Sequence, residues 1–157
     1  MTGAGTDLAR VHRAPGRVAE TPVDVTALVA QVSHPGAGAV ATFVGVVRDV
    51  NAGAAVCGIE YQAYPGMADH ELGAILAEAE ARWDGLRAAA QHRIGYLAVG
   101  EPSVAVAVSA AHRAPAFEAC RYVVEQLKRR VPVWKREHYA DGRREWVDGR
   151  LSGEGLA

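Results

Sequence analysis

The chain has 157 residues, of which 50% are hydrophobic and 22% are charged, and its formal net charge at pH 7 is −1. This length is typical of one domain with one core, and the composition excludes broad disorder. Because the net charge gives no general attraction for nucleic acid, an anion site has to be local and built from clustered cations. We predict one folded domain over residues 9–150, a disordered start at 1–8 and a flexible tail at 151–157.

The two cysteines, Cys57 and Cys120, are far apart, and no Cys/His cluster in the sequence has metal-ligand spacing. Cys120 lies on the apolar side of a helical pattern, which predicts a packed core thiol. Residues 1–7 lack the pattern of a signal peptide, and no apolar stretch reaches the roughly 20 residues of a membrane span. We therefore expect a cytoplasmic protein without a membrane segment or a bound metal.

Hydrophobic periodicity predicts an α+β fold, in which a mixed or antiparallel sheet is packed by about three helices and a β-hairpin follows near the C-terminus. In the first half of the chain the predicted elements are an edge strand at 9–14 continued at 17–20, a helix at 24–32, and strands at 38–47 and 56–64. In the second half they are a helix at 67–83 and strands at 87–97 and 103–111. A third helix, which has Pro115 in its first turn and ends before Pro132, leads to a hairpin of 133–139 with 145–148. The strand at 38–47 is nearly all apolar and rich in β-branched residues, which predicts burial on both faces.

Both lysines of the chain, Lys128 and Lys135, lie within residues 127–137, whereas the other 15 of the 17 Lys and Arg residues are arginines. A lysine that is desolvated or crowded by cations loses its proton, and its amine is then a nucleophile or a base, whereas an arginine stays charged. Three arginines in the same stretch supply such cations. The alternative is a helix end whose cations complement the terminal carbonyl groups, followed by a solvated strand. The two lysines converge only if the chain folds back at Pro132.

At two further positions, cationic side chains stand at the end of a predicted strand or at the start of a predicted helix. Arg48 follows the apolar strand at 38–47, where it either faces a ligand or lies in solvent as an ordinary strand end. His112 and Arg113 stand at a predicted helix start, whose free N–H groups favour a phosphate or carboxylate; the alternative is a local cap or a surface ion pair. The sequence contains no nucleophile elbow, HExxH or Walker loop. Lysine and arginine chemistry on an anionic substrate is what remains.

Several separated blocks between residues 11 and 150 resemble the large catalytic subunit of molybdopterin synthase. The blocks are GAVATFVGVVR at 38–48, YPGM at 64–67, HRIG at 92–95, SAAHR at 109–113 with AFEA at 116–119, LK at 127–128, WKRE at 134–137 and WV at 146–147. Their number and separation make the resemblance specific. Gln62, where an acidic residue is more usual, and Arg136, where a third lysine is common, depart from the family pattern outside the positions assigned to chemistry.

The resemblance implies an α+β homodimer, which forms a heterotetramer with a small ubiquitin-like sulfur carrier ending in Gly-Gly. The carrier's C-terminal thiocarboxylate enters the active site, and two deliveries place the dithiolene sulfurs on cyclic pyranopterin monophosphate (precursor Z) in molybdenum cofactor biosynthesis. The step consumes no metal or organic cofactor. A non-catalytic homologue that binds the carrier or an anionic ligand is the alternative.

The resemblance also implies roles for individual residues. Lys128 matches the lysine beside the carrier's thiocarboxylate, and Lys135 matches its companion for proton transfer and oxyanion stabilisation. The residues that match positions around the phosphate and pterin, some of them across the dimer, are Arg48, His112, Arg113 and Arg150, with Phe43 lining the pocket. Whether Lys128 becomes covalently acylated stays open.

Overall fold

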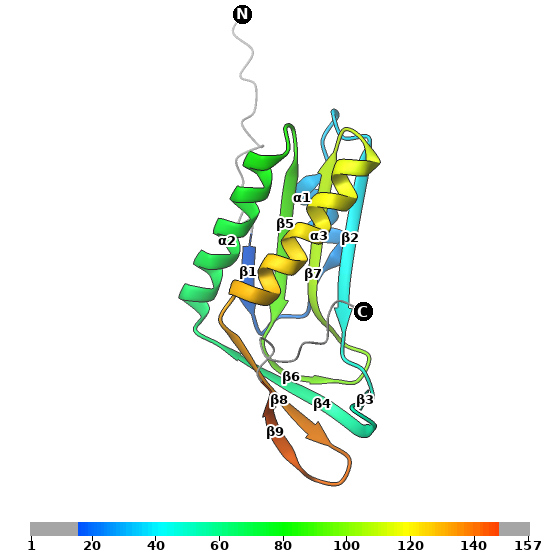
Figure 1. Cartoon of the computed structure of the whole chain (residues 1–157), viewed down its shortest axis with the longest axis vertical. Helices are drawn as coiled ribbons and strands as arrows, with labels where there is room; N and C mark the ends of the chain where they lie inside the picture. Colours follow the sequence, from blue (N-terminus) through cyan, green and yellow to red (C-terminus); the bar gives the residue numbers. More distant parts are fainter. Residues whose placement is uncertain (1–15, 148–157) are drawn as a thin grey trace, which may run out of the picture.

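The computed structural model describes residues 16–147, which form three helices and nine strands (Figure 1). In chain order they are β1 (Gly16–Ala19), α1 (Val25–Val32), β2 (Ala39–Val46), β3 (Val50–Asn51), β4 (Ala54–Ala63), α2 (Pro65–Arg82), β5 (Arg87–Arg93), β6 (Gly95–Ala98), β7 (Pro102–Ala110), α3 (Arg113–Arg130), β8 (Val133–Tyr139) and β9 (Arg144–Val147). The predicted α+β class is confirmed. The predicted strand at 9–14, the disordered start at 1–8 and the tail at 151–157 lie outside the described residues.

The larger core lies between α2, α3 and a mixed four-stranded sheet. The strand order is β1-β5-β7-β2, and β1 and β5 are its parallel pair. Leu72 and Ile75 of α2 and Val123 of α3 are fully buried against this sheet, because they recur at helical spacing on one face of each helix. The short helix α1 covers part of the opposite sheet face (Figure 1). Packing of both long helices on one face therefore fixes the direction of α3.

The end of α3 leads directly into β8. The Val131 amide donates to the Leu127 carbonyl at 3.1 Å, and the Val133 amide donates to the Val131 carbonyl at 2.9 Å. Pro132 has no amide hydrogen and cannot extend the helix, so the helix ends before it, as the sequence predicted, and the chain turns into β8. Lys128 in the last helical turn and Lys135 on β8 are thus joined by a short connection.

A second, antiparallel sheet has the order β3-β4-β8-β9, with β6 pairing the other side of β4. Its small core contains Val47, Val56, Ile59, Leu97 and Tyr139. In its register Tyr61 of β4 lies opposite Lys135 of β8. The predicted C-terminal hairpin is confirmed as β8 and β9.

The single strand predicted at 87–97 is wrong, because two strands occupy this segment. Gly95 adopts φ +92°, a left-handed conformation that favours glycine. There the chain leaves the first sheet after β5 and enters the second sheet as β6. One segment therefore ties the two sheets together.

The strand predicted at 38–47 exists, but its predicted burial on both faces is wrong. Among the described residues β2 pairs on one side with β7 and has no partner on the other, and Val40, Val44 and Val46 are 43%, 37% and 49% exposed. These alternate positions point to the sheet face that α1 covers only in part. No helix in the described part of the chain is long and apolar enough to cross a membrane.

Candidate active site

The structure brings Lys128 and Lys135 together at the junction of α3 and β8. Lys128 is open to solvent overall, so a substrate can reach it. Protein atoms around its amine nevertheless lower its pKa below the usual value by desolvation, and the positive charge of Lys135 lowers it further. The convergence that sequence spacing left open is thus present, and it makes the Lys128 amine easier to deprotonate than that of a free lysine.

A buried carboxylate faces Lys135. The Glu137 carboxylate lies 3.8 Å from the Lys135 amine, and the Glu137 side chain is 3% exposed. It accepts hydrogen bonds from the Asn51 amide at 2.7 Å and the Tyr139 hydroxyl at 2.5 Å. The Tyr139 hydroxyl donates to Glu137, and this raises the pKa of Tyr139. Glu137 is therefore fixed from three sides, and it holds the Lys135 ammonium in place.

His92 and Tyr61 complete the inner wall of the site. His92 is buried, which lowers its pKa to about 4, and the charge of Lys128 contributes to this lowering. Its Nδ1 lies 2.8 Å from the Arg93 carbonyl, an acceptor, so Nδ1 carries the proton and Nε2 a free lone pair. The Tyr61 ring meets His92 edge to face at 5.1 Å, and burial raises the Tyr61 pKa. A neutral imidazole thus lies beside the lysines at neutral pH.

Sequence reasoning assigned no role to Glu137, His92 or Tyr61. The sequence did contain one indication that Glu137 belongs with Lys135. Lys135, Glu137 and Tyr139 are alternate residues of a predicted strand, so their side chains lie on the same face. His92 comes from β5 in the other sheet, so no local spacing connects it with the lysines. Cys120 is a buried core thiol, as predicted, and burial raises its pKa to about 11.

His112 and Arg113 lie at the other end of α3 from the lysines (Figure 1). Both are exposed, and the His112 side chain makes no capping hydrogen bond. Fifteen residues separate Arg113 from Lys128, which is about 22 Å along a helix. The structure therefore does not bring these residues to the lysine pair within one chain.

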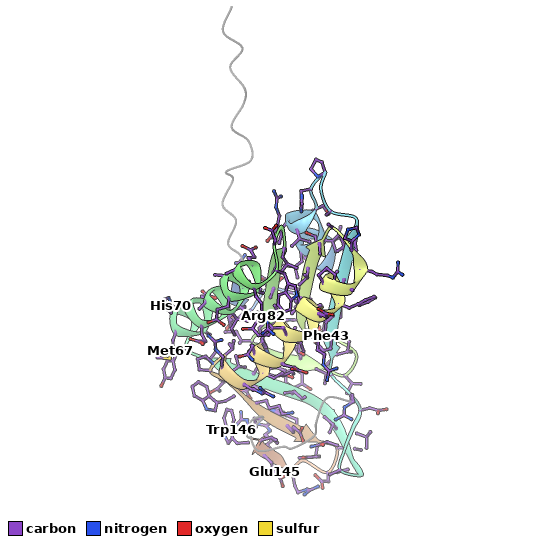
Figure 2. All side chains as sticks on the ribbon, turned by 45° about the horizontal axis from the view of Figure 1, so that its top comes forward. Phe43, Met67, His70, Arg82, Glu145 and Trp146 are labelled. Carbon is purple, nitrogen blue, oxygen red and sulfur yellow. The ribbon has the colours of Figure 1, made fainter. Side chains whose placement is uncertain are left out.

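The remaining predicted residues are Phe43, Arg48 and Arg150. Phe43 of β2 is half-buried and packs against the core that α3 covers (Figure 2). Arg48 is exposed and follows Val47, which packs with Ile59 and Tyr139 under the lysine-bearing sheet. Arg48 is thus on the side of the molecule that carries Lys135. Arg150 lies outside the described residues.

The described residues contain no group of three His, Cys, Asp or Glu side chains that could hold a metal ion. What they do contain is one amine with a lowered pKa and a second amine fixed by a buried carboxylate. Such a pair can bind an anion, stabilise a developing oxyanion and transfer a proton. Fold and candidate site together describe a single-domain α+β protein in which two lysines meet at the end of a helix.

Comparison with known proteins identifies the family. The model of the MoaE protein family matches residues 18–130, and the chain belongs to this family. A molybdopterin synthase catalytic subunit from Pseudomonas aeruginosa is 49% identical over 134 residues, which are 85% of this chain and 87% of the relative. The resemblance inferred from the sequence blocks is confirmed, together with the enzyme class that the family implies.

Solved structures agree with this assignment. Molybdopterin synthase from Staphylococcus aureus superposes with a TM-score of 0.80 at 34% identity, covering 83% of this chain and 95% of that chain. A complex of subunits 1 and 2 of molybdopterin-converting factor from Helicobacter pylori has a TM-score of 0.68 at 21% identity, covering 90% of this chain and 97% of that chain. At this identity the second likeness shows the fold alone.

Proposed function

We propose that this chain is the catalytic subunit of a molybdopterin synthase. It transfers sulfur from the C-terminal thiocarboxylate of a small ubiquitin-like carrier to cyclic pyranopterin monophosphate, and so forms the dithiolene of molybdopterin. The observation that carries the proposal is the convergence of Lys128 and Lys135, with the pKa of Lys128 lowered by desolvation and by the neighbouring charge. The family supplies the reaction, and the lysine pair supplies the groups that the reaction needs.

The two lysines divide the chemistry between them. Lys128, with its lowered pKa, meets the acyl carbon of the thiocarboxylate as a nucleophile or accepts a proton as a base. Lys135, held by Glu137, presents a fixed cation to the negative charge that develops on the acyl oxygen. His92 keeps a neutral nitrogen next to them, so it adds no further positive charge at neutral pH.

The pterin phosphate site is completed by a second copy of the chain. Ala39, at the start of β2, pairs with Ala110, two residues before His112, whereas Arg48 follows the other end of β2. Antiparallel pairing of two β2 edges around a two-fold axis therefore brings His112 and Arg113 of one copy toward Arg48 of the other. The exposed valines of β2 support such an interface. The proposed assembly is a homodimer that binds one carrier per copy.

An exposed aromatic surface at the start of β8 supports a protein partner. Tyr64 and Met67 are 67% and 63% exposed, and Trp134 precedes Lys135 on β8. The Tyr64 and Trp134 rings meet edge to face at 5.6 Å and line a pocket of about 330 Å³. The complex of two subunits solved for the Helicobacter pylori protein agrees with a small-subunit partner.

Two free cysteines, Cys57 and Cys120, fit the proposed cytoplasmic location.

The test is single-turnover conversion of the cyclic pterin by purified protein and thiocarboxylated carrier, with wild type compared with Lys128→Ala and Lys135→Ala. We expect dithiolene product from wild type and a loss of roughly a hundredfold or more in each variant, as for removal of a nucleophile or acid/base group. Arg121→Ala, on an exposed side of α3, is the matched control and should react as wild type does. Carrier binding without product in the wild type would instead identify a non-catalytic homologue.

A further inference from the structure

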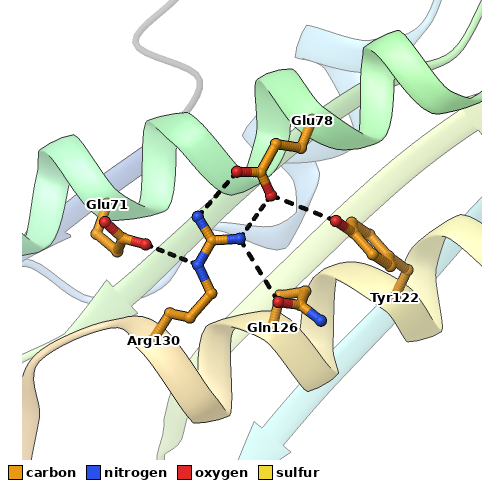
Figure 3. A network of polar contacts seen from close by, with 5 residues as sticks. All are labelled: Glu71, Glu78, Tyr122, Gln126 and Arg130. Carbon is orange, nitrogen blue, oxygen red and sulfur yellow. Dashed lines mark hydrogen bonds and ion pairs between the residues drawn. The ribbon is translucent and has the colours of Figure 1, made fainter.

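The last turn of α3 is held to α2 by a network of polar contacts around Arg130 (Figure 3). The Arg130 guanidinium donates to Glu78 through two nitrogens, at 2.5 and 2.9 Å, and to Glu71 at 2.7 Å. Glu71 and Glu78 stand two turns apart on one face of α2. The Tyr122 hydroxyl also donates to Glu78, at 3.3 Å. All three guanidinium nitrogens thus have carboxylate partners, which is the geometry that makes an arginine contact specific.

This network lies next to the site in the chain but takes no part in its chemistry. Arg130 is the last residue of α3, two residues after Lys128 and five before Lys135. Its guanidinium points to α2 (Figure 3). Among the described residues, Lys128 has no ion-pair partner. The position of the Lys128 amine therefore depends on how the last helical turn is held.

Apolar packing alone does not fix that turn. Leu127 and Val131 are buried on the core side, and the core residues of α2 and α3 already hold the two helices together. Such contacts are non-directional and tolerate small rotations of a helix end. The bidentate contact with Glu78 and the third contact with Glu71 are directional, and they restrain rotation of the turn that carries Lys128.

We propose that Arg130 is a positioning residue, which clamps the end of α3 to α2 through Glu71 and Glu78 and thereby keeps the Lys128 amine beside Lys135. The relevance of this clamp to catalysis rests on the proposed function, but the clamp itself does not. When the clamp is lost, the turn is free to rotate, and the Lys128 amine moves toward solvent and away from the second cation. The catalytic rate then falls while carrier binding is retained.

The chain offers a direct test, because it contains two lysines. Lysine labelled with ¹³C at Cε gives two side-chain NMR signals, which Lys128→Arg and Lys135→Arg assign. The titratable neighbours of the Lys128 amine are Lys135 on β8 and His92 on β5, with Glu137 and Tyr61 next to Lys135. Titration of the wild type should place the Lys128 pKa below the 10.5 of a free lysine.

In Arg130→Met we expect the pKa of Lys128 to rise toward that of a free lysine, because both desolvation and the charge of Lys135 act on it less. Glu78→Gln, which keeps the shape of the network and removes its charge, should act in the same direction to a smaller extent. Arg121→Met is the control, since Arg121 pairs with Glu125 on its own helix and does not reach α2. It should leave both lysine signals unchanged.

An unchanged Lys128 titration in folded Arg130→Met and Glu78→Gln would overturn the proposal. A loss of thermal stability without a change in the titration would assign Arg130 a purely structural role and would also overturn it. In the turnover assay, kcat should fall roughly ten- to hundredfold with little change in KM for the carrier, as for a small displacement of a reacting group. If the wild type gave no product, the NMR titration would still decide whether Arg130 positions Lys128.

Discussion

At the scale of single residues, the proposed function depends on the difference between lysine and arginine. The chain uses arginine at 15 of its 17 Lys and Arg positions and places its two lysines in one site. An arginine keeps its charge at any working pH, whereas the environment of Lys128 lowers its pKa. The scarcity of lysine was visible in the sequence, so the pair could be predicted. The residues around the two lysines could not be predicted, because Glu137 and His92 come close to them through strand register and sheet packing.

The two lysines should respond differently to arginine. In Lys128→Arg the amine that loses a proton is replaced by a group that cannot, so we expect single-turnover activity to fall roughly a hundredfold. In Lys135→Arg a fixed cation remains beside Glu137, and a milder loss of about tenfold or less is expected. The measurement is the rate of dithiolene formation at saturating carrier. Equal losses in the two variants would contradict the division of roles.

His92 should make stability depend on pH. Its pKa is lowered from 6.5 in the unfolded chain to about 4 in the folded protein. Between these values the unfolded chain binds a proton that the folded chain does not, so the free energy of unfolding rises with pH. The stability is fully present above pH 6.5 and is lost as pH falls toward 4, by up to about 3 kcal/mol.

Urea unfolding of wild type and His92→Gln from pH 4 to pH 7 measures this dependence. The variant should show a flatter profile, because no histidine titrates at that position. His70→Gln, on the exposed surface of α2, is the control and should keep the wild-type slope. A slope in His92→Gln equal to that of wild type would assign the acid sensitivity to other groups.

At the scale of helices and strands, the sequence determined the types of the elements and left their neighbours open. The helix at 67–83 and the lysine-bearing helix were predicted because apolar residues recur at helical spacing on one face. The nearly all-apolar segment at 38–47 predicts a strand buried on both faces, yet among the described residues it is an edge strand. The apolar composition of a strand indicates that its surface is buried in the folded protein, but not whether the same chain or another one buries it. The break at Gly95 was missed because a glycine in a strand pattern also fits an unbroken strand.

The turn between β7 and α3 provides a prediction at this scale. The Gly38 amide donates to Ala110 at 3.0 Å, and a Cβ at Gly38 would lie inside contact distance of the Ala111 carbonyl oxygen. Gly38→Ala should therefore displace the loop before His112 and destabilise the fold by about 1–3 kcal/mol, as overpacking does. Binding of the pterin phosphate should weaken, while the titration of Lys128 should not change.

Gly73 is the control position for the substitution at Gly38. It lies within α2, and a Cβ there would meet no atom within 4 Å. Gly73→Ala should stabilise the protein by about 0.5–1 kcal/mol, because alanine loses less conformational entropy in a helix. Denaturant unfolding of both variants compares the two positions. Destabilisation by Gly73→Ala of the same size as by Gly38→Ala would contradict the steric explanation.

At the scale of the whole molecule, the two groups of candidate site residues lie at opposite ends of one helix. Lys128 and Arg113 occupy opposite ends of α3, about 22 Å apart along the helix axis. Sequence alone proposed both groups, since each combines cations with a helix end. It could not show how far apart they lie, because that follows from the length and direction of a packed helix.

A mixture of two inactive variants tests the composite site. Lys128→Ala and Arg113→Ala, after subunit exchange, form heterodimers in which one site keeps all of its residues. Half of the dimers are mixed and each has one intact site, so we expect recovery of about a quarter of the wild-type activity. Mixing Lys128→Ala with Lys135→Ala is the control, because both changes affect the lysine group and activity should not return. No recovery in the first mixture would place the complete site within one subunit.

In the proposed dimer, helix α3 would set the distance between two active sites. Its 18 residues separate the end that carries Lys128 from the end that carries His112 and Arg113. Inserting or deleting a residue within it would rotate one end relative to the other by about 100° and would misalign both sites at once. Among relatives, changes in chain length should accordingly gather at turns such as Asp141–Gly142 and be absent from α3. Residues gained or lost at such turns would leave the two ends of this helix in the same relative orientation.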